Sequence, residues 1–504
     1  MESLWRKQIG EINSNLIETK PINIEKRKLE QIKSKVKKES QLYDVIIVGA
    51  GLAGILTAYY LTKKGKSVLI LEAKEIASGQ TERTTAKITS QHGLKYSKLV
   101  KIVGSEKARL YAKANEQAIR EYEKLIESNH INCQFERVSS YLYTTKNEEI
   151  LKEEARVAKF LGINAFFTTE TELPFYVKGA VCFKNQAQFS PLQFVKAVIP
   201  ELEILEHTKV VAVKGNQVFT EDMAFQAKKI VIATHYPILN IPGFYFLRQH
   251  QERSYVLALS NCTNFKNGIL ENMYYGIDED GLSFRRAGEY VLLGGASHRT
   301  GENQNGGKYK LLEQVAKQYF PDSKEITRWS AQDCMPHDEI PFIGKYSIFT
   351  PNLYVITGFQ KWGMTSSMVS AMILVDTLCD NKNPYEKLFS PQRLHLKASF
   401  ENLIIDTSTS VKGLTKGMFH KPKKTEVDLE YGHGGIVTIE GQRYACYKDE
   451  EGQLHKISAK CPHLGCELTW NVDEKTWDCP CHGSRFDIDG NLLDNPSKKD
   501  KRLD

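Results

Sequence analysis

Four cysteines and two histidines lie within the stretch CPHLGCELTWNVDEKTWDCPCHGS, residues 461–484. Thiolates and imidazoles at this density can hold a zinc ion, form disulfides or bind a redox-active iron centre. Cys461 and His463 form a C-x-H pair, which is tighter than the C-x2-4-C spacing common in zinc sites. A zinc ion held by two cysteines and two histidines would also leave Cys466 and Cys481 unexplained. Zinc therefore accounts for these residues least completely.

The boxes CPHLGC (461–466) and CPCHGS (479–484) closely resemble those of a Rieske [2Fe-2S] domain of the disulfide-bearing kind found in respiratory and photosynthetic complexes. In such a domain two thiolates hold one iron, and two neutral imidazoles hold the other and raise the potential into the range of roughly −150 to +300 mV. The resemblance implies the following roles: Cys461, His463, Cys479 and His482 as ligands, a Cys466–Cys481 disulfide, and Ser484 as a hydrogen-bond donor to a bridging sulfide.

Two departures from that family pattern bear on the potential and on the exposure of the cluster. High-potential members carry a tyrosine two residues after the serine, and its hydroxyl bonds a ligand sulfur, whereas this chain has Phe486. Losing a donor to sulfur disfavours the reduced cluster, so we expect a potential in the lower or middle part of the range. Few residues follow Pro496, so we also expect a short covering loop and exposed histidines.

A second motif lies near the start of the chain. GAGLAG directly follows the apolar run DVIIV and precedes a helix, and Glu72 ends the next apolar run. In such a βαβ unit Gly49 makes the turn, Gly51 lets the backbone approach a pyrophosphate, and Gly54 lets helix meet strand. Glu72 would bind the ribose hydroxyls. The context predicts a dinucleotide site.

Further stretches resemble the flavoenzymes of the D-amino-acid oxidase and glycine oxidase superfamily, in order and spacing, over roughly residues 40–390. The stretches are ASGQTERTTAKITSQHG (77–93), IVIATHYP (230–237), DEIPFIG (338–344) and GFQKWGMTSSM (358–368). The resemblance implies FAD as the nucleotide, and it implies contacts from Thr84, Thr85, Val210, Ala233 and Thr234 and a flavin-ring lining of Gly358, Gly363, Met364 and Thr365. The helix that begins after Gly363 would point its N-terminal amides at the ring and stabilise the reduced flavin.

These motifs require an α/β fold with a discontinuous Rossmann-like FAD-binding domain, a mixed-sheet substrate domain and a small all-β Rieske domain. We expect an N-terminal helical extension over 1–40, with an amphipathic helix at 24–39, and the oxidoreductase over 41–390. The substrate domain would span about 135–330, a linker 391–425 and the Rieske domain 426–504. The segment 105–128 has the apolar spacing of a scaffold helix.

Composition excludes several classes of partner. The net charge of +7 over 504 residues is too mild to indicate nucleic-acid binding. No apolar run reaches the length of a membrane span and the start lacks a signal peptide, so we expect a cytoplasmic protein. Peripheral membrane contact through the basic helix at 24–39 is the minority interpretation.

Together the two modules resemble a bacterial family of FAD-dependent oxidoreductases with a C-terminal Rieske domain. The resemblance implies a dehydrogenase in which an amine or amino acid gives hydride to the flavin, and single electrons pass through the cluster to an external acceptor. One alternative is the reverse flow, from an external donor through the cluster to a flavin-dependent reductase. Another is a non-catalytic electron carrier or redox sensor.

Substrate contacts are weakly specified by the sequence. Lys361 and Trp362 adjoin the predicted flavin-lining turn and are candidates for the active-site wall. Arginines in the substrate domain could clamp a carboxylate in a bidentate manner. The candidates there are Arg285, Arg286, His298 and Arg299, although the favoured interpretation of each is a surface or structural residue.

Overall fold

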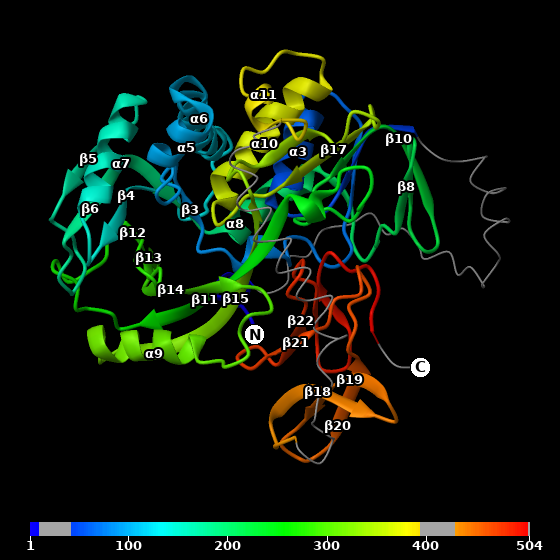
Figure 1. Ribbon diagram of the computed structural model, residues 1–504. Coiled ribbons are helices and arrows are strands. Elements are labelled where there is room, and N and C mark those ends of the chain that lie inside the picture. The colour runs from blue at the N-terminus through cyan, green and yellow to red at the C-terminus, as the bar shows by residue number, and fades with distance from the viewer. Residues whose placement is uncertain (10–41, 394–428, 502–504) are drawn as a thin grey trace.

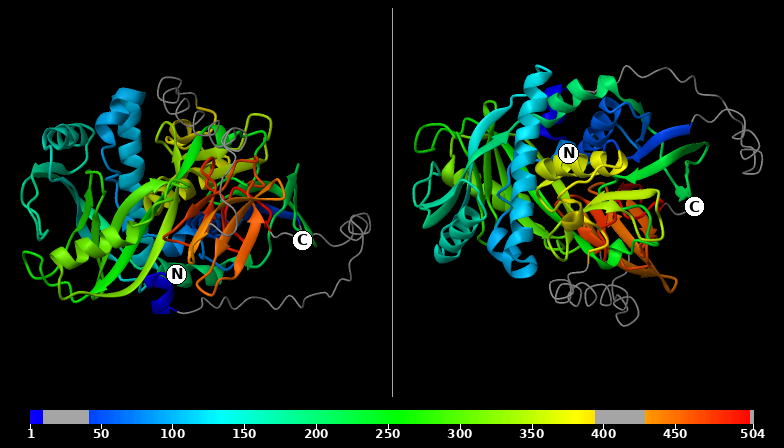
Figure 2. Two further views of the ribbon diagram at one scale, coloured as in Figure 1. Left: turned by 60° about the horizontal axis from the view of Figure 1, so that its bottom comes forward. Right: turned by 90° about the horizontal axis from the view of Figure 1, so that it is seen from above.

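The computed structural model describes residues 1–9, 42–393 and 429–501, which form three bodies (Figure 1). The first is a mostly parallel sheet with helices, the second is a larger mixed sheet, and the third is a small all-β unit shown in orange and red. The small unit lies against strands β11 (Gln249–Ser260) and β15 (Lys324–Pro336) of the second body. The further views in Figure 2 show the same contact.

The first sheet contains the glycine turn. Its strand order is β16-β17-β10-β1-β2-β7, parallel throughout except for β16 at the edge. The strands are β1 (Leu42–Val48), β2 (Val68–Leu71), β7 (Glu203–Leu205), β10 (Ala224–Ile232), β16 (Phe342–Lys345) and β17 (Leu353–Thr357). A hairpin of β8 (Ala212–Lys214) and β9 (Gln217–Phe219) extends from β10. The helices on this sheet are α3 (Leu52–Lys63) and α10 (Gly363–Leu378), which pack against each other.

The second sheet has the order β15-β11-β14-β13-β12-β4-β6-β3, with β5 paired to β6. Its other strands are β3 (Lys87–Ile88), β4 (Glu136–Thr144), β5 (Ala165–Thr168), β6 (Gly179–Gln188), β12 (Met273–Gly276), β13 (Ser283–Ala287) and β14 (Tyr290–Arg299). The helices around it are α5 (Tyr96–Val103), α6 (Ser105–Ser128), α7 (Glu149–Phe160) and α9 (Lys308–Tyr319). Short elements complete both bodies: α1 (Leu4–Ile9), α4 (Gln80–Arg83), α8 (Pro191–Val198), η1 (Ile199–Glu201), η2 (Tyr245–Leu247) and α11 (Glu386–Phe389).

The third body consists of two small antiparallel sheets, β18-β19-β20 and β21-β22-β23-β24. The first contains β18 (His433–Ile439), β19 (Gln442–Lys448) and β20 (Leu454–Ser458). The second contains β21 (Thr469–Asn471), β22 (Thr476–Asp478), β23 (Arg485–Phe486) and β24 (Leu492–Asp494). The cysteine boxes are the loops that precede β21 and follow β22.

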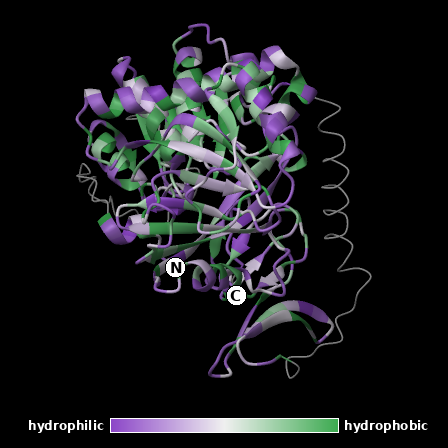
Figure 3. Ribbon diagram, turned by 90° about the vertical axis from the view of Figure 1, so that its left-hand side faces the viewer, coloured by the Kyte–Doolittle hydropathy of each residue, from purple (hydrophilic) through white to green (hydrophobic). Residues whose placement is uncertain are grey.

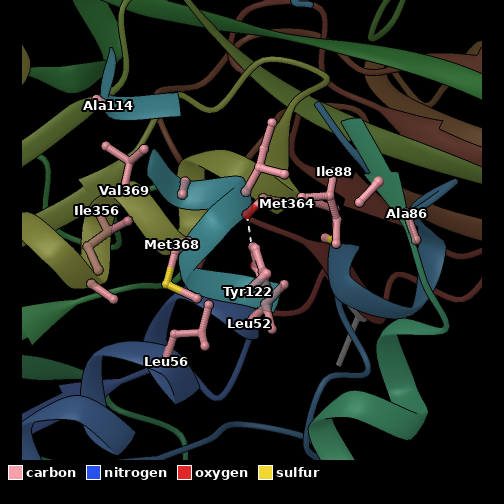
Figure 4. Packing of buried hydrophobic residues seen from close by; sticks show 14 of the residues in the cluster. Leu52, Leu56, Ala86, Ile88, Ala114, Tyr122, Ile356, Met364, Met368 and Val369 are labelled. Atoms are coloured by element: carbon pink, nitrogen blue, oxygen red, sulfur yellow. Dashed lines mark hydrogen bonds between the residues drawn. The ribbon is translucent and has the colours of Figure 1, made fainter. Parts of the chain in front are cut away.

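The sequence pattern explains which helices are central. α3 and α10 are apolar on nearly all sides, because they lie between the parallel sheet and neighbouring helices. Figure 4 shows the result, with Leu52 and Leu56 of α3 packed near Met364 and Met368 of α10. α6 instead buries one face and leaves charged residues on the other, and the outer helices in Figure 3 are accordingly banded in purple and green.

The predicted fold class is confirmed, and so are the βαβ unit and the helix at 105–128. The amphipathic helix expected at 24–39 and most of the linker lie outside the described residues. Residues 1–9, which we assigned to an extension, instead bury Trp5 in the core of the oxidoreductase. Among the described helices, none combines the length and apolar character that a membrane crossing requires.

Candidate functional site

A cavity of about 350 Å³ lies where the three bodies meet. This volume falls in the range of cofactor and small-molecule sites. It is lined by most of the residues that the sequence predicted to bind FAD: Gly49, Gly51, Glu72, Thr84, Thr85, Val210, Ala233, Thr234, Gly358, Gly363 and Met364. Lys361 and Trp362 line it as well.

The glycine turn explains its own composition. Gly49 has φ +111°, and a Cβ there would overlap the carbonyl of Ala233 on the neighbouring strand. A Cβ on Gly54 would overlap the carbonyl oxygen of Gly49. A Cβ on Gly51 would meet only the Thr81 hydroxyl, at 3.6 Å, and Gly51 borders the cavity. The space that a side chain at Gly51 would fill is therefore left free for a ligand at the N-terminus of α3, as a dinucleotide phosphate requires.

Glu72 is held at the end of β2 by two backbone amides. Its Oε2 accepts from Ala50 N at 2.8 Å and its Oε1 accepts from Lys74 N at 2.9 Å. These bonds fix the carboxylate at the rim of the cavity, where ribose hydroxyls can donate to its remaining lone pairs.

Thr84 and Thr85 lie on the loop between α4 and β3, and this loop is held from behind. Trp5 Nε1 donates to Thr84 O at 2.7 Å, and the Arg285 guanidinium donates to the carbonyls of Thr85 and Ala86. The N-terminal helix and a strand of the second sheet therefore both position the cavity wall.

The N-terminus of α10 also borders the cavity, as predicted. Gly363, Met364 and Ser367 line the cavity, whereas Thr365 does not. The Thr365 hydroxyl bonds Thr89 O and His92 Nε2, each at 3.1 Å, on the buried side of the helix. The prediction of a ring-lining role for Thr365 is therefore wrong, because the helix turns this residue toward the core.

Lys361 and Trp362 form part of the wall beside this turn. Lys361 Nζ bonds Ser297 Oγ at 2.5 Å and pairs with Glu252 Oε2 at 3.2 Å. The Trp362 ring stacks on His92 with 5.0 Å between centroids, and its other neighbour is the edge of Tyr275 at 5.5 Å. The pair thus presents a cation and a flat apolar surface at one end of the cavity.

A half-buried carboxyl, that of Asp333, lies beside this cation. Burial raises the pKa of Asp333 to about 7, and Lys361 offsets only part of that rise. Burial also favours the neutral form of Glu252, but His250 and Lys361 outweigh it and lower its pKa to about 2. Glu252 is therefore the permanent counter-ion of Lys361, and Asp333 can exchange a proton near neutral pH.

Sequence reasoning missed Asp333 and Lys87. Lys87 lines the cavity, and its Nζ lies within hydrogen-bond distance of Thr85 Oγ1 and Ser283 Oγ, at 3.2 and 3.4 Å. Burial, aided by the nearby Arg285 cation, lowers the pKa of Lys87 to about 7. Asp333 belongs to no local motif, and Lys87 lies within the 77–93 stretch at a position to which that stretch assigned no role. The pairing of distant strands brings both residues to the cavity.

The remaining substrate-contact candidates lie outside the cavity lining. Arg285 is buried and donates to Gln188 Oε1 and Phe189 O as well as to the 85–86 loop. His298 bonds Tyr255 OH at 3.0 Å and Arg299 O at 2.7 Å, and Arg286 pairs with Glu136. The donors of Arg285 and the ring nitrogens of His298 are used structurally, so the structure does not support a carboxylate clamp at Arg285 or a catalytic role for His298.

In the third body the two cysteine boxes fold into matching loops. Cys461 N donates to Cys466 O at 2.8 Å and Gly465 N donates to Cys461 O at 2.9 Å. In the second loop Cys479 N donates to Ser484 O and Gly483 N to Cys479 O, at the same two distances. The Cys466–Cys481 disulfide joins the loops. The four predicted ligands therefore face one another from two similar supports.

The donors fit an iron–sulfur cluster. The His463 and His482 rings lie 4.9 Å apart, and His463 Nδ1 is buried with no hydrogen-bond partner among the described residues. An iron atom is the partner that such a nitrogen needs. The hydrogen bond between the two ligand cysteines lowers the pKa of Cys461, against the opposing effect of burial, and raises that of Cys479, so the first thiolate of the pair forms on Cys461.

Another sulfur group in the same loops is tighter than the predicted ligand set. The sulfur atoms of Cys466, Cys479 and Cys481 lie within 4.8 Å of one another. Two of these three form the disulfide and carry no thiolate, so they cannot replace the predicted ligands. Ser484 is fully buried beside Cys461, and its Oγ accepts from Ser497 N at 2.9 Å.

The histidine end of the third body is covered by the oxidoreductase. Gln251 Nε2 donates to His482 O at 2.6 Å, His463 Nε2 bonds Asn240 Oδ1 at 2.8 Å, and Phe246 meets both imidazole rings edge-on. His482 is only 5% exposed. The expectation of exposed histidines is therefore wrong for His482, because a neighbouring body, not a long loop, covers it.

One segment of the third body also borders the cavity. Residues 493–498, here called the wall segment, contribute Leu493, Asp494, Asn495, Ser497 and Lys498 to its lining. The same segment bonds Ser484 in the cluster loops through Ser497 N. The cavity and the cysteine–histidine loops thus lie on two sides of one strip of backbone.

Comparison with known proteins agrees with this geometry. The family model described as FAD dependent oxidoreductase (DAO) matches residues 44–377, and the Rieske [2Fe-2S] domain model matches residues 422–502. The chain is 37% identical to the "Putative Rieske 2Fe-2S iron-sulfur protein YhfW" of Bacillus subtilis (strain 168), over 90% of this chain and 92% of that protein.

Two solved structures share the fold of the first two bodies. Glycine oxidase from Geobacillus kaustophilus has a TM-score of 0.60 at 18% identity, covering 70% of this chain and 100% of that one. L-proline dehydrogenase from P. horikoshii has a TM-score of 0.57 at 16% identity, covering 72% and 99%. The chain belongs to the DAO family of FAD-dependent oxidoreductases, and it carries a C-terminal Rieske domain and the sites for FAD and a [2Fe-2S] cluster.

Proposed function

We propose that this protein is an amine or amino-acid dehydrogenase that passes electrons from its substrate through FAD and the Rieske cluster to an external acceptor. When bound, FAD takes two electrons as a hydride, whereas the cluster carries one electron at a time. The substrate class is supported by the two solved structures above, which are a glycine oxidase and an L-proline dehydrogenase.

The observation that carries the proposal is the shared wall. The wall segment borders the FAD cavity on one side and bonds the cluster loops on the other. Gln332 strengthens this junction, since its Nε2 donates both to Gly483 O, at 2.8 Å, and to Gln251 Oε1, at 2.7 Å. Two redox sites held this close on one chain are suited to internal electron transfer, which needs no diffusing carrier between them.

The residues at the substrate end can do the accompanying proton chemistry. A substrate ammonium must lose a proton before its carbon can release a hydride. Asp333 and Lys87 have pKa values near 7, and the basic form of either can accept that proton. Trp362 and Tyr275 provide flat walls that exclude water, and Lys361 can bind a substrate carboxylate while Glu252 keeps it charged.

An anaerobic titration tests the proposal. The holoprotein is mixed with a panel of amines and amino acids, and flavin absorbance is followed together with the electron paramagnetic resonance signal of the reduced cluster. We expect at least one compound to bleach the flavin and then to produce the cluster signal. A His463→Ala variant, which lacks an iron ligand, should still bleach but give no cluster signal.

The other outcomes would overturn the proposal. If no compound bleaches the flavin, the chain is an electron carrier or a redox sensor. If the cluster potential lies well below that of the flavin, and a strong one-electron donor reduces the flavin through the cluster, the flow runs in the opposite direction.

A further inference from the structure

The wall segment lies beside the part of the cavity that would hold the diphosphate of FAD. Asn495 Nδ2 lies 3.5 Å from Thr234 O, and Thr234 adjoins the carbonyl against which Gly49 is packed. Lys74 Nζ donates to Leu493 O at 3.1 Å, and the Lys74 amide holds the ribose-binding Glu72. The segment therefore runs along the phosphate and ribose side of the site.

Lys498, three residues beyond Asn495 in the wall segment, carries an amine that has no counter-ion in the part of the chain that the structure describes. It lines the cavity and is partly buried, and no carboxylate of the described residues forms an ion pair with it. Its neighbour Lys499 points to solvent. The only strong anion of FAD is its diphosphate, and the amides of the glycine turn can satisfy only part of its oxygens.

The wall segment is fixed at both ends, so it cannot swing open by itself. Asp494 pairs with Arg485 at 2.9 Å and with the buried Arg253 of β11 at 3.2 Å. At the other end Ser497 N bonds the fully buried Ser484. Moving this segment would expose charges that are paired in the folded chain, which is costly.

We propose that the Rieske domain completes the FAD site: Lys498 binds the diphosphate, and the wall segment traps the dinucleotide until the two domains separate. This extends the site beyond the family fold, which lacks these residues. It depends on FAD binding but not on the identity of the substrate, so the dehydrogenase proposal can fail while this one stands.

The first test compares two adjacent lysines. FAD is removed from wild type, Lys498→Ala and Lys499→Ala, and rebinding is titrated by flavin fluorescence, with iron and sulfide content as the check on the fold. A lost charge-assisted contact should raise the dissociation constant of Lys498→Ala about tenfold or more. Lys499→Ala should bind as wild type does, and Lys498→Arg should recover most of the affinity.

Two results would overturn the role of Lys498. One is an unchanged FAD affinity in Lys498→Ala. The other is a shifted cluster potential with no change in FAD affinity, which would assign the amine to His463 and the cluster instead.

The second test loosens the domain contact away from both cofactors. Asp473 accepts from Asn303 Nδ2 at 2.7 Å and from the amides of Gly307 and Lys308, all on the oxidoreductase. Asp473→Ala should speed FAD release several-fold, measured by transfer to an excess of an apoflavoprotein. Asp489→Ala, at an exposed carboxylate that pairs with His455, is the matched control and should release FAD at the wild-type rate.

Hydrogen exchange at residues 303–308 shows whether the contact in Asp473→Ala has loosened. Faster exchange there with unchanged FAD release would contradict the trap. If exchange in Asp473→Ala is unchanged, FAD release is measured on Asp473→Lys, which places a cation against the same two amides. An unchanged release rate in that variant would also contradict the trap.

Discussion

Gly54 and Gly51 lie in one turn, yet they respond to different constraints. A Cβ on Gly54 would overlap the Gly49 carbonyl, whereas one on Gly51 would enter the cavity. Gly54→Ala should lower the free energy of unfolding by about 1–3 kcal/mol, as overpacking does, and should also weaken FAD binding. Gly51→Ala should weaken FAD binding while the stability of the FAD-free protein stays unchanged. Denaturant unfolding and flavin titration separate the two, and equal losses of stability would contradict this account.

Phe486 replaces a residue that tunes the cluster in high-potential relatives. It is fully buried beside Trp477, its partner in the β22–β23 pair. Phe486→Tyr should raise the midpoint potential, because a hydroxyl near a ligand sulfur stabilises the reduced cluster. A redox titration monitored by electron paramagnetic resonance measures the shift, and a lower or unchanged potential would show that the hydroxyl does not reach the sulfur.

Asp333 should make stability depend on pH in an unusual direction. Its folded pKa of about 7 lies above the ordinary aspartate value of 3.8, so between these two pH values the folded protein holds a proton that the unfolded chain has released. The unfolding free energy should therefore fall as pH rises from about 4 to about 7, by up to about 1.4 kcal/mol per pH unit from this group. Asp333→Asn should remove that part of the slope in denaturant unfolding from pH 5 to 8. Parallel curves for the two proteins would refute the assignment.

Among individual residues, the sequence predicted those whose role depends on their near neighbours in the chain. The glycine turn and Glu72 depend on neighbours within a few positions, so their context predicted them. The roles in the cysteine boxes were implied by the resemblance to a Rieske domain. Thr365 was misassigned because the direction of a side chain depends on what packs against its element. Asp333 carries no motif at all, since only the β11–β15 pairing brings it beside Lys361.

The N-terminal helix α1 is a short element with an effect on the site. Trp5 is fully buried and donates to Thr84 O on the cavity wall. Trp5→Ala should cost about 3–5 kcal/mol of stability and weaken FAD binding. Trp5→Phe keeps most of the packing and loses the hydrogen bond, at about 1 kcal/mol. Thermal unfolding with flavin fluorescence tests both, and wild-type FAD affinity in Trp5→Ala would separate the helix from the site.

Elements with strong local patterns were predictable, and their partners were not. The βαβ unit and the helix at 105–128 follow from apolar runs and spacing, and the structure confirms both. The second sheet takes in β3 at Lys87–Ile88, well before the expected boundary at 135, because a two-residue strand leaves no periodic signal. The burial of α1 could not be predicted either, since six residues are too few to show a periodic apolar pattern.

At the scale of the whole molecule, the contact between domains should make unfolding cooperative. Glu474 of the Rieske domain accepts from Ser330 Oγ and Tyr309 OH and pairs with Arg253, all on the oxidoreductase. Glu474→Gln should cost about 3–5 kcal/mol at the contact, because it removes one carboxylate charge from a buried network and leaves Arg253 paired with Asp494 alone among the described residues. Wild type should lose flavin and cluster in one thermal transition, whereas the variant should lose them in two.

The matched control is Glu450→Gln, since Glu450 is exposed and, among the described residues, its ion-pair partner is Lys475, in a pair worth little. A single transition in Glu474→Gln would contradict strong coupling of the domains.

The contact between the Rieske domain and the oxidoreductase could not be predicted from the sequence. The boxes identified a Rieske domain, but nothing in their spacing shows which face of another body covers His482. Nor does it show that the wall segment borders the same cavity as the glycine turn, which lies more than four hundred residues earlier in the chain. Such contacts depend on the shape and charge of two finished surfaces. The expected cytoplasmic location and the identity of the acceptor stay predictions.

The place of the wall segment along the chain bears on the order of biogenesis. Ribosomes deliver a protein from its N-terminus, and domains fold largely in that order. Residues 42–393 therefore emerge before the wall segment, the last side of their cavity, has been translated. The cavity is most open to FAD at this stage of synthesis. Metal insertion requires residues from Cys461 onward and follows later. The order of translation therefore predicts that FAD binds before the cluster is inserted.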